Sequence, residues 1–291
     1  MGNKEKAKER REKRMQEISI LRTIPYSDDQ RWWSKETVAV VTGGNRGIGF
    51  EICRQLAEHG LTVILTSRDA SAGCEAAKVL QESGLSLVSH QLDVLDSSSI
   101  CHFADWLQKN YAGLDILVNN AGVNFNLGFD NSVENAHRVI KTNYYGIKIM
   151  TETMIPLMKP SIKGARIVNV SSRLGRLNGR RNRIGDVALR EQLDDEETLS
   201  EELVDRTLST FLQQVEDGTW TSNGWPQTFT DYSVSKLAVN AYTRLVARKL
   251  LEQPEGNNTA EEGADTGVWL ALLPDQAVSG KFFAERREIK F

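Results

Sequence analysis

The stretch TVAVVTGGNRGIGFEI, residues 37–52, joins a short apolar, β-branched run to an amphipathic helical pattern through a glycine-rich turn. A continuous apolar run of this kind is typical of a strand that is buried on both faces of a parallel sheet. Glycines in such a turn let the backbone approach a pyrophosphate at the helix N-terminus, where unpaired N–H groups favour negative charge. The turn therefore predicts a nucleotide site, although a tight strand–helix connection alone could also require its glycines.

Similar apolar runs recur along the chain, and helical patterns lie between them, for example at residues 48–60 and 69–84. This alternation predicts βαβ units in an α/β fold, a doubly wound parallel sheet of the Rossmann-like type. A single domain suits a chain of 291 residues of which 40% are hydrophobic. The further candidate strands are residues 61–66, 85–93, 114–120 and 165–172.

A long insertion, residues 173–230, follows the last of these candidate strands. Within it, residues 200–218 carry apolar side chains at helical spacing and predict an amphipathic helix, whereas residues 175–186 predict a basic loop. A further helix is expected at residues 233–253. The insertion is therefore expected to be mainly helical.

The alternation breaks again near the C-terminus. Residues 251–269, LEQPEGNNTAEEGADTGVW, join two helical patterns, at residues 233–253 and 259–274, with no strand-like run between them. The final residues, 280–291, predict a strand or hairpin. In an alternating α/β sheet a strand is expected between two such helices, but residues 251–269 show no strand-like pattern.

Composition excludes several classes of function. The net charge of −3 and the pI near 5.9 do not suit a nucleic-acid-binding domain. The three cysteines and four histidines lack the spacing of a disulfide framework or a metal site, so no metal is expected. No run approaches the roughly 18 apolar residues of a membrane span, and no signal peptide is evident, so we expect a cytoplasmic protein.

The first residues, 1–35, form a basic extension that we expect to be a disordered or helical arm outside the fold. Contact of this arm with a nucleic acid or a membrane is an alternative interpretation. The main domain is then expected to span residues 36–291.

Two arginines point to the phosphorylated dinucleotide. A ribose-binding acid at the end of the second strand is typical of NAD sites, whereas a basic residue there accommodates the 2′-phosphate of NADP. The sequence at this position is TSRD, which supplies Arg68, and Arg46 lies in the glycine-rich turn. Asp69 could be the ribose-binding acid instead, but its place before a helix favours an N-cap.

Tyr232 and Lys236 are four residues apart in a helical pattern, so their side chains are expected on one face. A tyrosine, with a reference pKa of about 10, is a poor acid–base catalyst near neutrality. A neighbouring ammonium lowers the pKa of the phenol toward the working pH. Ser172, at the carboxyl end of a strand, could hold a substrate carbonyl. Singly, each residue could also be a chance pair or a turn residue.

Together these motifs resemble the short-chain dehydrogenase/reductase family, and within it the branch of carbonyl reductases and plant salutaridine and menthone (neomenthol) reductases. The family's TGxxxGIG, LDV, NNAG, Asn, Ser and Y-x-x-x-K motifs all have counterparts in order. The cofactor-binding residues that the resemblance implies are Gly43, Asn45, Arg46, Gly47, Ile48, Gly49, Arg68, Asp93, Val94, Asn120, Ala121 and Gly122, with Tyr232 and Lys236.

The resemblance also implies catalytic roles. Tyr232 would protonate the carbonyl oxygen, and Ser172 would orient it. Lys236 would bind the nicotinamide ribose and lower the pKa of Tyr232, and Asn143 would support a water relay. The insertion resembles one that covers a helix face used by other members for dimers, so a monomer is expected.

One departure from the family concerns its sixth strand and the Pro-Gly turn after it, since no proline here precedes a glycine. We expect a deletion near residues 257–259. Either the C-terminal segment, residues 280–291, would then move inward, or an interior edge of the sheet would stay unpaired at a cost of about 1 to 3 kcal/mol per buried group.

The sequence thus predicts an NADPH-dependent oxidoreductase that reduces a carbonyl of a hydrophobic small molecule to an alcohol, or the reverse. The alternative is a non-catalytic NADPH-binding protein or an inactive isoform that lacks the nicotinamide and substrate segment. No nucleic-acid or membrane partner is expected.

Overall fold

The computed structural model describes residues 31–126, 132–160, 165–179 and 182–251. It also describes short segments at 258–261, 271–272, 281–284 and 287–289, and helical residues at positions 5, 8, 9, 12, 13 and 16. The rest of the predicted N-terminal arm, up to residue 30, lies outside the described residues. None of the described helices is long and apolar enough to cross a bilayer.

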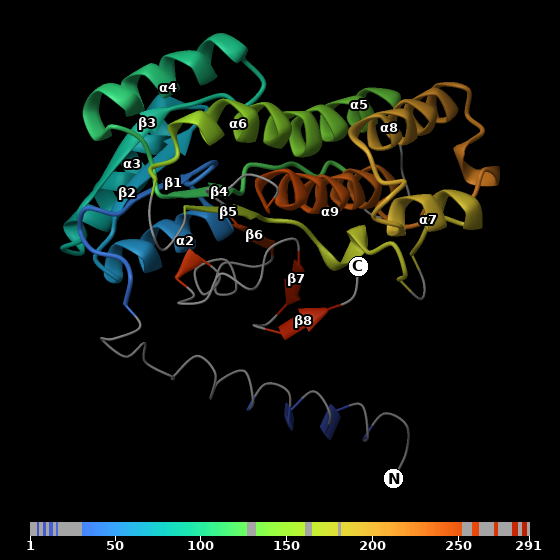
Figure 1. The fold of residues 1–291 in the computed structure, drawn as a ribbon, viewed down its shortest axis with the longest axis horizontal. Coiled ribbons are helices and arrows are strands. Elements are labelled where there is room, and N and C mark those ends of the chain that lie inside the picture. Colours follow the sequence, from blue (N-terminus) through green and yellow to red (C-terminus); the bar gives the residue numbers. More distant parts are fainter. Residues whose placement is uncertain are drawn as a thin grey trace.

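The described residues form one sheet of eight strands, in the order β3-β2-β1-β4-β5-β6-β7-β8 (Figure 1). Its first seven strands run parallel, and β8 pairs antiparallel with β7 at the edge. The predicted doubly wound α/β fold is thus confirmed. The strands from the apolar runs are β1 (Val38–Val41), β2 (Thr62–Ser67), β3 (Leu87–Gln91), β4 (Ile116–Asn119) and β5 (Arg166–Asn169).

Helices cover both faces of this sheet, with α2 and α3 on one side and α4, α6 and α9 on the other (Figure 1). Alternate side chains of strands β1 to β5 enter two hydrophobic clusters, so that Val38 and Val40 face one layer and Ala39 and Val41 the other. The helices are α2 (Gly47–Glu58), α3 (Ala70–Glu82), α4 (Ser97–Tyr111), α5 (Val133–Ile140), α6 (Gly146–Met154), α7 (Val187–Asp194), α8 (Glu201–Glu216) and α9 (Thr230–Leu251).

Shorter helical turns connect these elements. A π-helical turn, η1 (Lys141–Tyr145), continues α5 into α6, and π-helical turns are frequent at functional sites. The 3₁₀ turns are η2 (Ile155–Leu157), η3 (Arg173–Gly175) and η4 (Trp220–Ser222).

The segment before the first strand packs on the domain. Trp33 is buried, and its indole N–H donates to the carbonyl oxygen of His59 at 3.1 Å. The Arg166 guanidinium, at the start of β5, lies 4.1 Å from the ring centroid of Trp32. Residues 31–33, predicted to belong to the N-terminal arm, are therefore part of the folded body.

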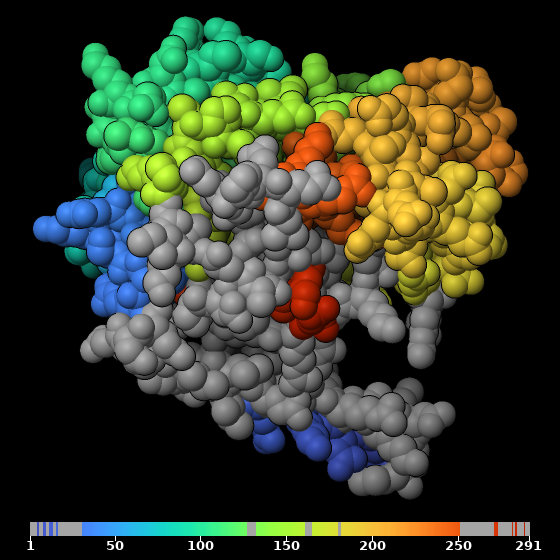
Figure 2. Space-filling view, viewed as in Figure 1, coloured from blue at the N-terminus to red at the C-terminus, as the bar shows by residue number. Residues whose placement is uncertain are grey.

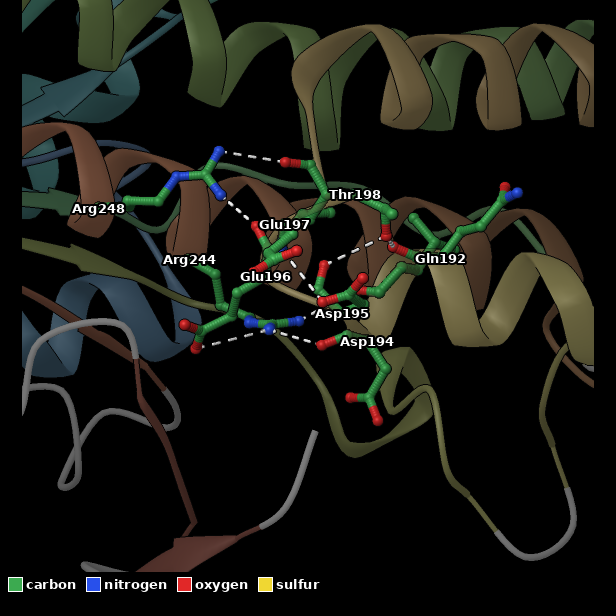
Figure 3. A network of polar contacts seen from close by, with 10 residues as sticks. Gln192, Asp194, Asp195, Glu196, Glu197, Thr198, Arg244 and Arg248 are labelled. Carbon is green, nitrogen blue, oxygen red and sulfur yellow. Dashed lines mark hydrogen bonds and ion pairs between the residues drawn. The ribbon is translucent and has the colours of Figure 1, made fainter.

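The insertion contains α7 and α8, and the predicted amphipathic helix at residues 200–218 is confirmed as α8. Its apolar face packs on α5 and α9, and in Figure 2 the insertion, yellow to orange, forms one side of the molecule next to α9. Two arginines of α9 fix the connection between α7 and α8 (Figure 3). Arg244 donates to the carbonyl oxygens of Leu193 and Asp194, and Arg248 to those of Glu196 and Leu199.

Two outcomes were expected beside β5: an unpaired edge, or residues 280–291 in the position of the sixth strand. Both expectations are wrong. β6 (Asn258–Glu261) pairs in parallel with β5, and β7 (Lys281–Ala284) pairs with β6. The C-terminal segment keeps the seventh position and ends in β8 (Arg287–Ile289), which confirms the predicted hairpin. Residues 258–261 occupy the position between β5 and β7 because the N–H and C=O groups along β5 require hydrogen-bond partners, and any extended backbone can supply them.

The helix predicted at residues 259–274 is therefore wrong at its start, where residues 259–261 belong to β6. Of the remainder, the structure describes Ala271, which is helical, and Leu272, which lies in a turn. Both side chains are buried in the cluster that includes α2 and α3.

Candidate active site

A cavity of about 990 Å³ opens where strands β1 to β5 end. This is the edge at which open α/β sheets bind ligands, and the volume lies at the upper end of the range for small-molecule sites. All the residues predicted for the site line this cavity except Asn143 and Ser172. Tyr232 and Lys236 thus lie on the same cavity as the glycine-rich turn, as the sequence analysis requires.

The start of α2 in this cavity is not capped by any side chain. Its N-cap residue, Arg46, makes no capping hydrogen bond, whereas Asp69 caps α3 and Asp96 caps α4 through hydrogen bonds to backbone N–H groups. Gly47 follows with a φ of 58°, a left-handed conformation that favours glycine. The first N–H groups of α2 are therefore available to an anion such as a pyrophosphate.

The glycine-rich turn is braced against the end of β4. The Asn120 amide donates to the carbonyl oxygens of Thr42 and Gly43 at 2.8 and 3.2 Å. The Thr42 hydroxyl accepts the N–H groups of Asn120 and Ala121, both at 2.9 Å. A Cβ atom on Gly49 would clash with the Asn120 amide and with the Gly43 carbonyl oxygen. Close backbone approach therefore requires glycine at residue 49.

Arg68, which was predicted to contact the 2′-phosphate of NADP, follows directly after β2. Arg68 and Arg46 both line the cavity and are exposed. The Asp69 carboxylate accepts the N–H of Ala72 at 3.0 Å, which confirms the N-cap interpretation of this residue. The cavity thus presents two exposed arginine side chains beside the glycine-rich turn.

The end of β3 supplies Asp93 and Val94 to the cavity. The Asp93 carboxylate accepts the N–H of Leu95 at 2.9 Å, and the backbone N–H of Asp93 donates to the hydroxyl of Ser99 at 3.0 Å. These bonds fix the backbone at this wall.

Lys236 is held close to the ring of Tyr232. It is 3% exposed, and its ammonium donates to the carbonyl oxygen of Val170, at the end of β5, at 2.6 Å. The same ammonium lies 5.8 Å from the centroid of the Tyr232 ring. The positive charge is therefore fixed between the strand end and the tyrosine.

Asn143 lies behind the cavity wall, fully buried in η1. Its amide donates to the Val123 carbonyl oxygen at 2.9 Å and to the Ser235 hydroxyl at 3.0 Å. Its side-chain oxygen accepts the N–H of Val123 at 2.8 Å. Asn143 therefore holds the loop after β4 in place.

The structure does not bring Ser172 to the cavity wall. Its hydroxyl caps η3 by accepting the N–H of Leu174 at 3.2 Å. The neighbouring Ser171 lines the cavity, and its hydroxyl donates to the Lys236 carbonyl oxygen and the Asn240 side chain. The catalytic role of Ser172 stays a prediction.

Other lining residues were missed from the sequence. Val123, Asn124 and Phe125 follow the NNAG segment and form a wall, and the guanidinium of Arg138 lies 4.4 Å from the centre of the Phe125 ring. Lys141 lines the cavity one turn after Arg138. The sequence indicates part of this wall, because Arg138 and Lys141 are three residues apart in a helical pattern and therefore lie on one face of a helix.

Comparisons with known proteins agree with this geometry. A family model described as "short chain dehydrogenase" matches residues 37–183. The chain is 38% identical to the protein named salutaridine reductase from Papaver bracteatum, over 86% of this chain and 94% of that protein. It is 36% identical to "Carbonyl reductase [NADPH] 1" from Bos taurus, over 89% of this chain and 99% of that protein.

A solved structure also resembles this fold closely. The menthone neomenthol reductase from Mentha piperita superimposes with a TM-score of 0.77 at 38% identity, over 86% of this chain and 99% of that protein.

Proposed function

Because the chain belongs to the short-chain dehydrogenase family, we propose that it uses NADPH to reduce the carbonyl of a hydrophobic small molecule to an alcohol, or catalyses the reverse reaction. Its relatives make it an oxidoreductase of the short-chain type. The observation that carries the proposal is that Tyr232 and Lys236 line the same cavity as the uncapped start of α2.

NADPH fits the residues present. The open N-terminus of α2 would hold the pyrophosphate, and Arg46 and Arg68 would hold the 2′-phosphate. A carbonyl reductase among the relatives carries NADPH in its name. When bound, the cofactor supplies the hydride.

In the proposed mechanism the protein supplies the proton. The Tyr232 hydroxyl donates to the substrate oxygen, and the nearby Lys236 ammonium stabilises the phenolate that forms. The hydrogen bond to Val170 keeps this ammonium beside the tyrosine throughout. Neither Ser172 nor Asn143 lines the cavity, so their roles in holding the substrate oxygen and in returning the proton stay predictions.

The wall of residues 123–125 contains Val123 and Phe125 on either side of Asn124, and Val170 also lines the cavity, which favours a substrate with an apolar part. Apolar area removed from water contributes about 25 cal/mol per Å², so such a wall selects hydrophobic carbonyl compounds.

The decisive experiment measures NADPH oxidation with a panel of aldehydes and ketones, alongside a titration of NADPH binding. Tyr232→Phe should lower kcat by about 10² to 10⁴-fold, because general acid catalysis contributes about that much, and should leave the Kd for NADPH nearly unchanged. Binding without turnover, identical in wild type and Tyr232→Phe, would instead support the non-catalytic alternative.

The cofactor assignment has its own test. Arg68→Ala should weaken NADPH binding about tenfold or more, since a charge-assisted contact contributes about 1.5 to 3 kcal/mol, and should leave NADH binding unchanged. Arg54→Ala is the matched control, because Arg54 pairs with Glu51 and Glu58 on α2 away from the cavity. Equal losses for both cofactors would contradict the role of Arg68.

We also expect a monomer, because α8 packs over α5 and α9. Analytical ultracentrifugation at micromolar concentration tests this expectation.

A further inference from the structure

The residue immediately before the proposed catalytic tyrosine is a buried acid. Asp231 is 0% exposed, in the first turn of α9. Its Oδ1 accepts the backbone N–H of Tyr232 at 2.7 Å and the side-chain amide of Asn126 at 3.3 Å. A buried carboxyl is costly unless hydrogen-bonded, and even when paired it seldom stabilises more than an apolar side chain of similar size.

The position of Asp231 is partly favourable, because acids are stabilised at the N-terminal turn of a helix. That effect does not explain the contact with Asn126, which lies 105 residues away in the sequence. Asn126 is itself 7% exposed, and it directly follows the three cavity-lining residues Val123, Asn124 and Phe125.

The other end of this three-residue wall is tied to the same tyrosine. At Val123, both backbone groups bond to Asn143, whose amide also donates to the Ser235 hydroxyl. Ser235 in turn donates to the Tyr232 carbonyl oxygen at 2.7 Å. The backbone carbonyl group of Tyr232 is thus connected to the start of the wall.

The backbone N–H of the same residue is connected to the end of the wall through Asp231 and Asn126. The first connection runs through Asn143, which the family's motifs already include. The second connection, through Asp231 and Asn126, has no such explanation.

We propose that Asp231 is a positioning residue, which together with Asn126 fixes the wall of residues 123–125 relative to the Tyr232 hydroxyl. The inference rests on the proposed function, because the wall would contact the substrate that Tyr232 protonates. A displacement of about 1 Å in such a site can lower the rate about 10²-fold, so a single misplaced bond here has a large effect.

The test separates position from stability. Asp231→Ala removes the acceptor and should lower kcat about tenfold or more, with the KM for NADPH unchanged, because the bond acts on the substrate wall. Asp231→Asn keeps an acceptor oxygen for both donors and should stay within about threefold of wild type.

Asn126→Ala should reproduce the loss in kcat, and the double variant Asn126→Ala/Asp231→Ala should be no worse than Asp231→Ala alone, since both changes break one connection. Asp186→Ala is the matched control, because Asp186 also accepts a backbone N–H at a helix start, in α7. Normal kcat in Asp231→Ala, multiplicative losses in the double variant, or an equal loss in Asp231→Asn would each overturn the proposal.

A second measurement does not depend on turnover. Hydrogen exchange at the amides of residues 123–126 should be faster in Asp231→Ala than in wild type, and unchanged in Asp186→Ala. If wild type turns over no carbonyl compound, the proposed function fails while this measurement still decides the inference. Unchanged exchange would overturn it whatever the activity.

Discussion

Strands β1 and β6 have the same length, and both are interior strands of the sheet, but their sequences share little. Each spans four residues, and each lies between two parallel neighbours. β1 reads VAVV, and all its side chains are buried; β6 reads NTAE, with residues that strands tend to exclude. The first strand forms from its own residues, whereas the second forms because the edge of β5 needs a partner.

The consequence concerns where stability resides. β1 contributes to both hydrophobic clusters and pairs with β2 and β4. β6 pairs Ala260 with Val168 on one side and with Lys281 on the other. We therefore expect β1 to be essential for folding and β6 to support mainly the C-terminal part of the sheet.

The largest expected effect comes from a matched pair of proline substitutions. Val40→Pro removes a ladder hydrogen bond and a fully buried side chain at the centre of the sheet, so we expect no folded protein. Ala260→Pro removes a ladder bond in a strand whose own residues do not favour extended structure, so we expect a folded protein whose unfolding free energy falls by on the order of 3 kcal/mol. Circular dichroism and urea unfolding measure both outcomes.

Two results would contradict this comparison. If Ala260→Pro also fails to fold, β6 is as essential as β1. If it unfolds like wild type, β6 adds little to the sheet.

The next prediction concerns the nucleotide site at the end of β1. In Gly49→Ala the added methyl group must displace the Asn120 amide or the Gly43 backbone. Overpacking of this kind costs about 1 to 3 kcal/mol, and if the turn must be restored to hold the pyrophosphate, NADPH affinity should fall by about 5- to 150-fold. Ala260→Pro should change it less, because β6 contributes no described wall to the cavity.

Gly218→Ala is the control for Gly49→Ala. Gly218 has a φ of 70° and nothing within 4 Å of an added Cβ atom, so this variant strains the backbone outside the cavity without a steric clash and should leave NADPH affinity unchanged. Equal NADPH affinity in Gly49→Ala and wild type would show that the turn can relax.

The same contrast explains what the sequence could reveal. The strands β1 to β5 and the helix α8 were predictable, because local periodicity reports which side chains will be buried. The residues of the glycine-rich turn were predictable, because their chemistry is local too. β6 was not predictable, because it forms to pair the backbone groups of β5, and its own residues show no strand-like pattern.

The site shows the same limit. That Ser171 rather than its neighbour Ser172 lines the cavity depends on the local path of the backbone after β5. The contact between Asn126 and Asp231 joins residues far apart in the sequence. Only the folded structure brings such pairs together, since a single sequence reports periodicity and spacing but not long-range contact.

The smallest expected effect lies in the helical layer. Lys148 of α6 bonds to Glu201 of α8 at 2.9 Å and to Asp205 at 3.3 Å, and Lys249 of α9 also pairs with Glu201. Partial burial raises the pKa of Glu201, but hydrogen bonds from Lys249 and Lys148 outweigh it and hold the pKa below the ordinary 4.5. A depressed pKa in the folded state stabilises the protein above pH 4.5, and this contribution disappears as the pH falls below it.

Glu201→Gln should therefore lower the unfolding free energy by about 1 kcal/mol at neutral pH, and the difference should vanish in urea unfolding well below pH 4.5. Glu82→Gln, in an exposed pair with Lys78 at 3.9 Å, is the control and should have no measurable effect. The network joins α6, α8 and α9 without contacting either strand, so its loss should add to that of Ala260→Pro. A larger combined loss would mean that the helical layer supports β6 directly, because α9 also packs against that strand.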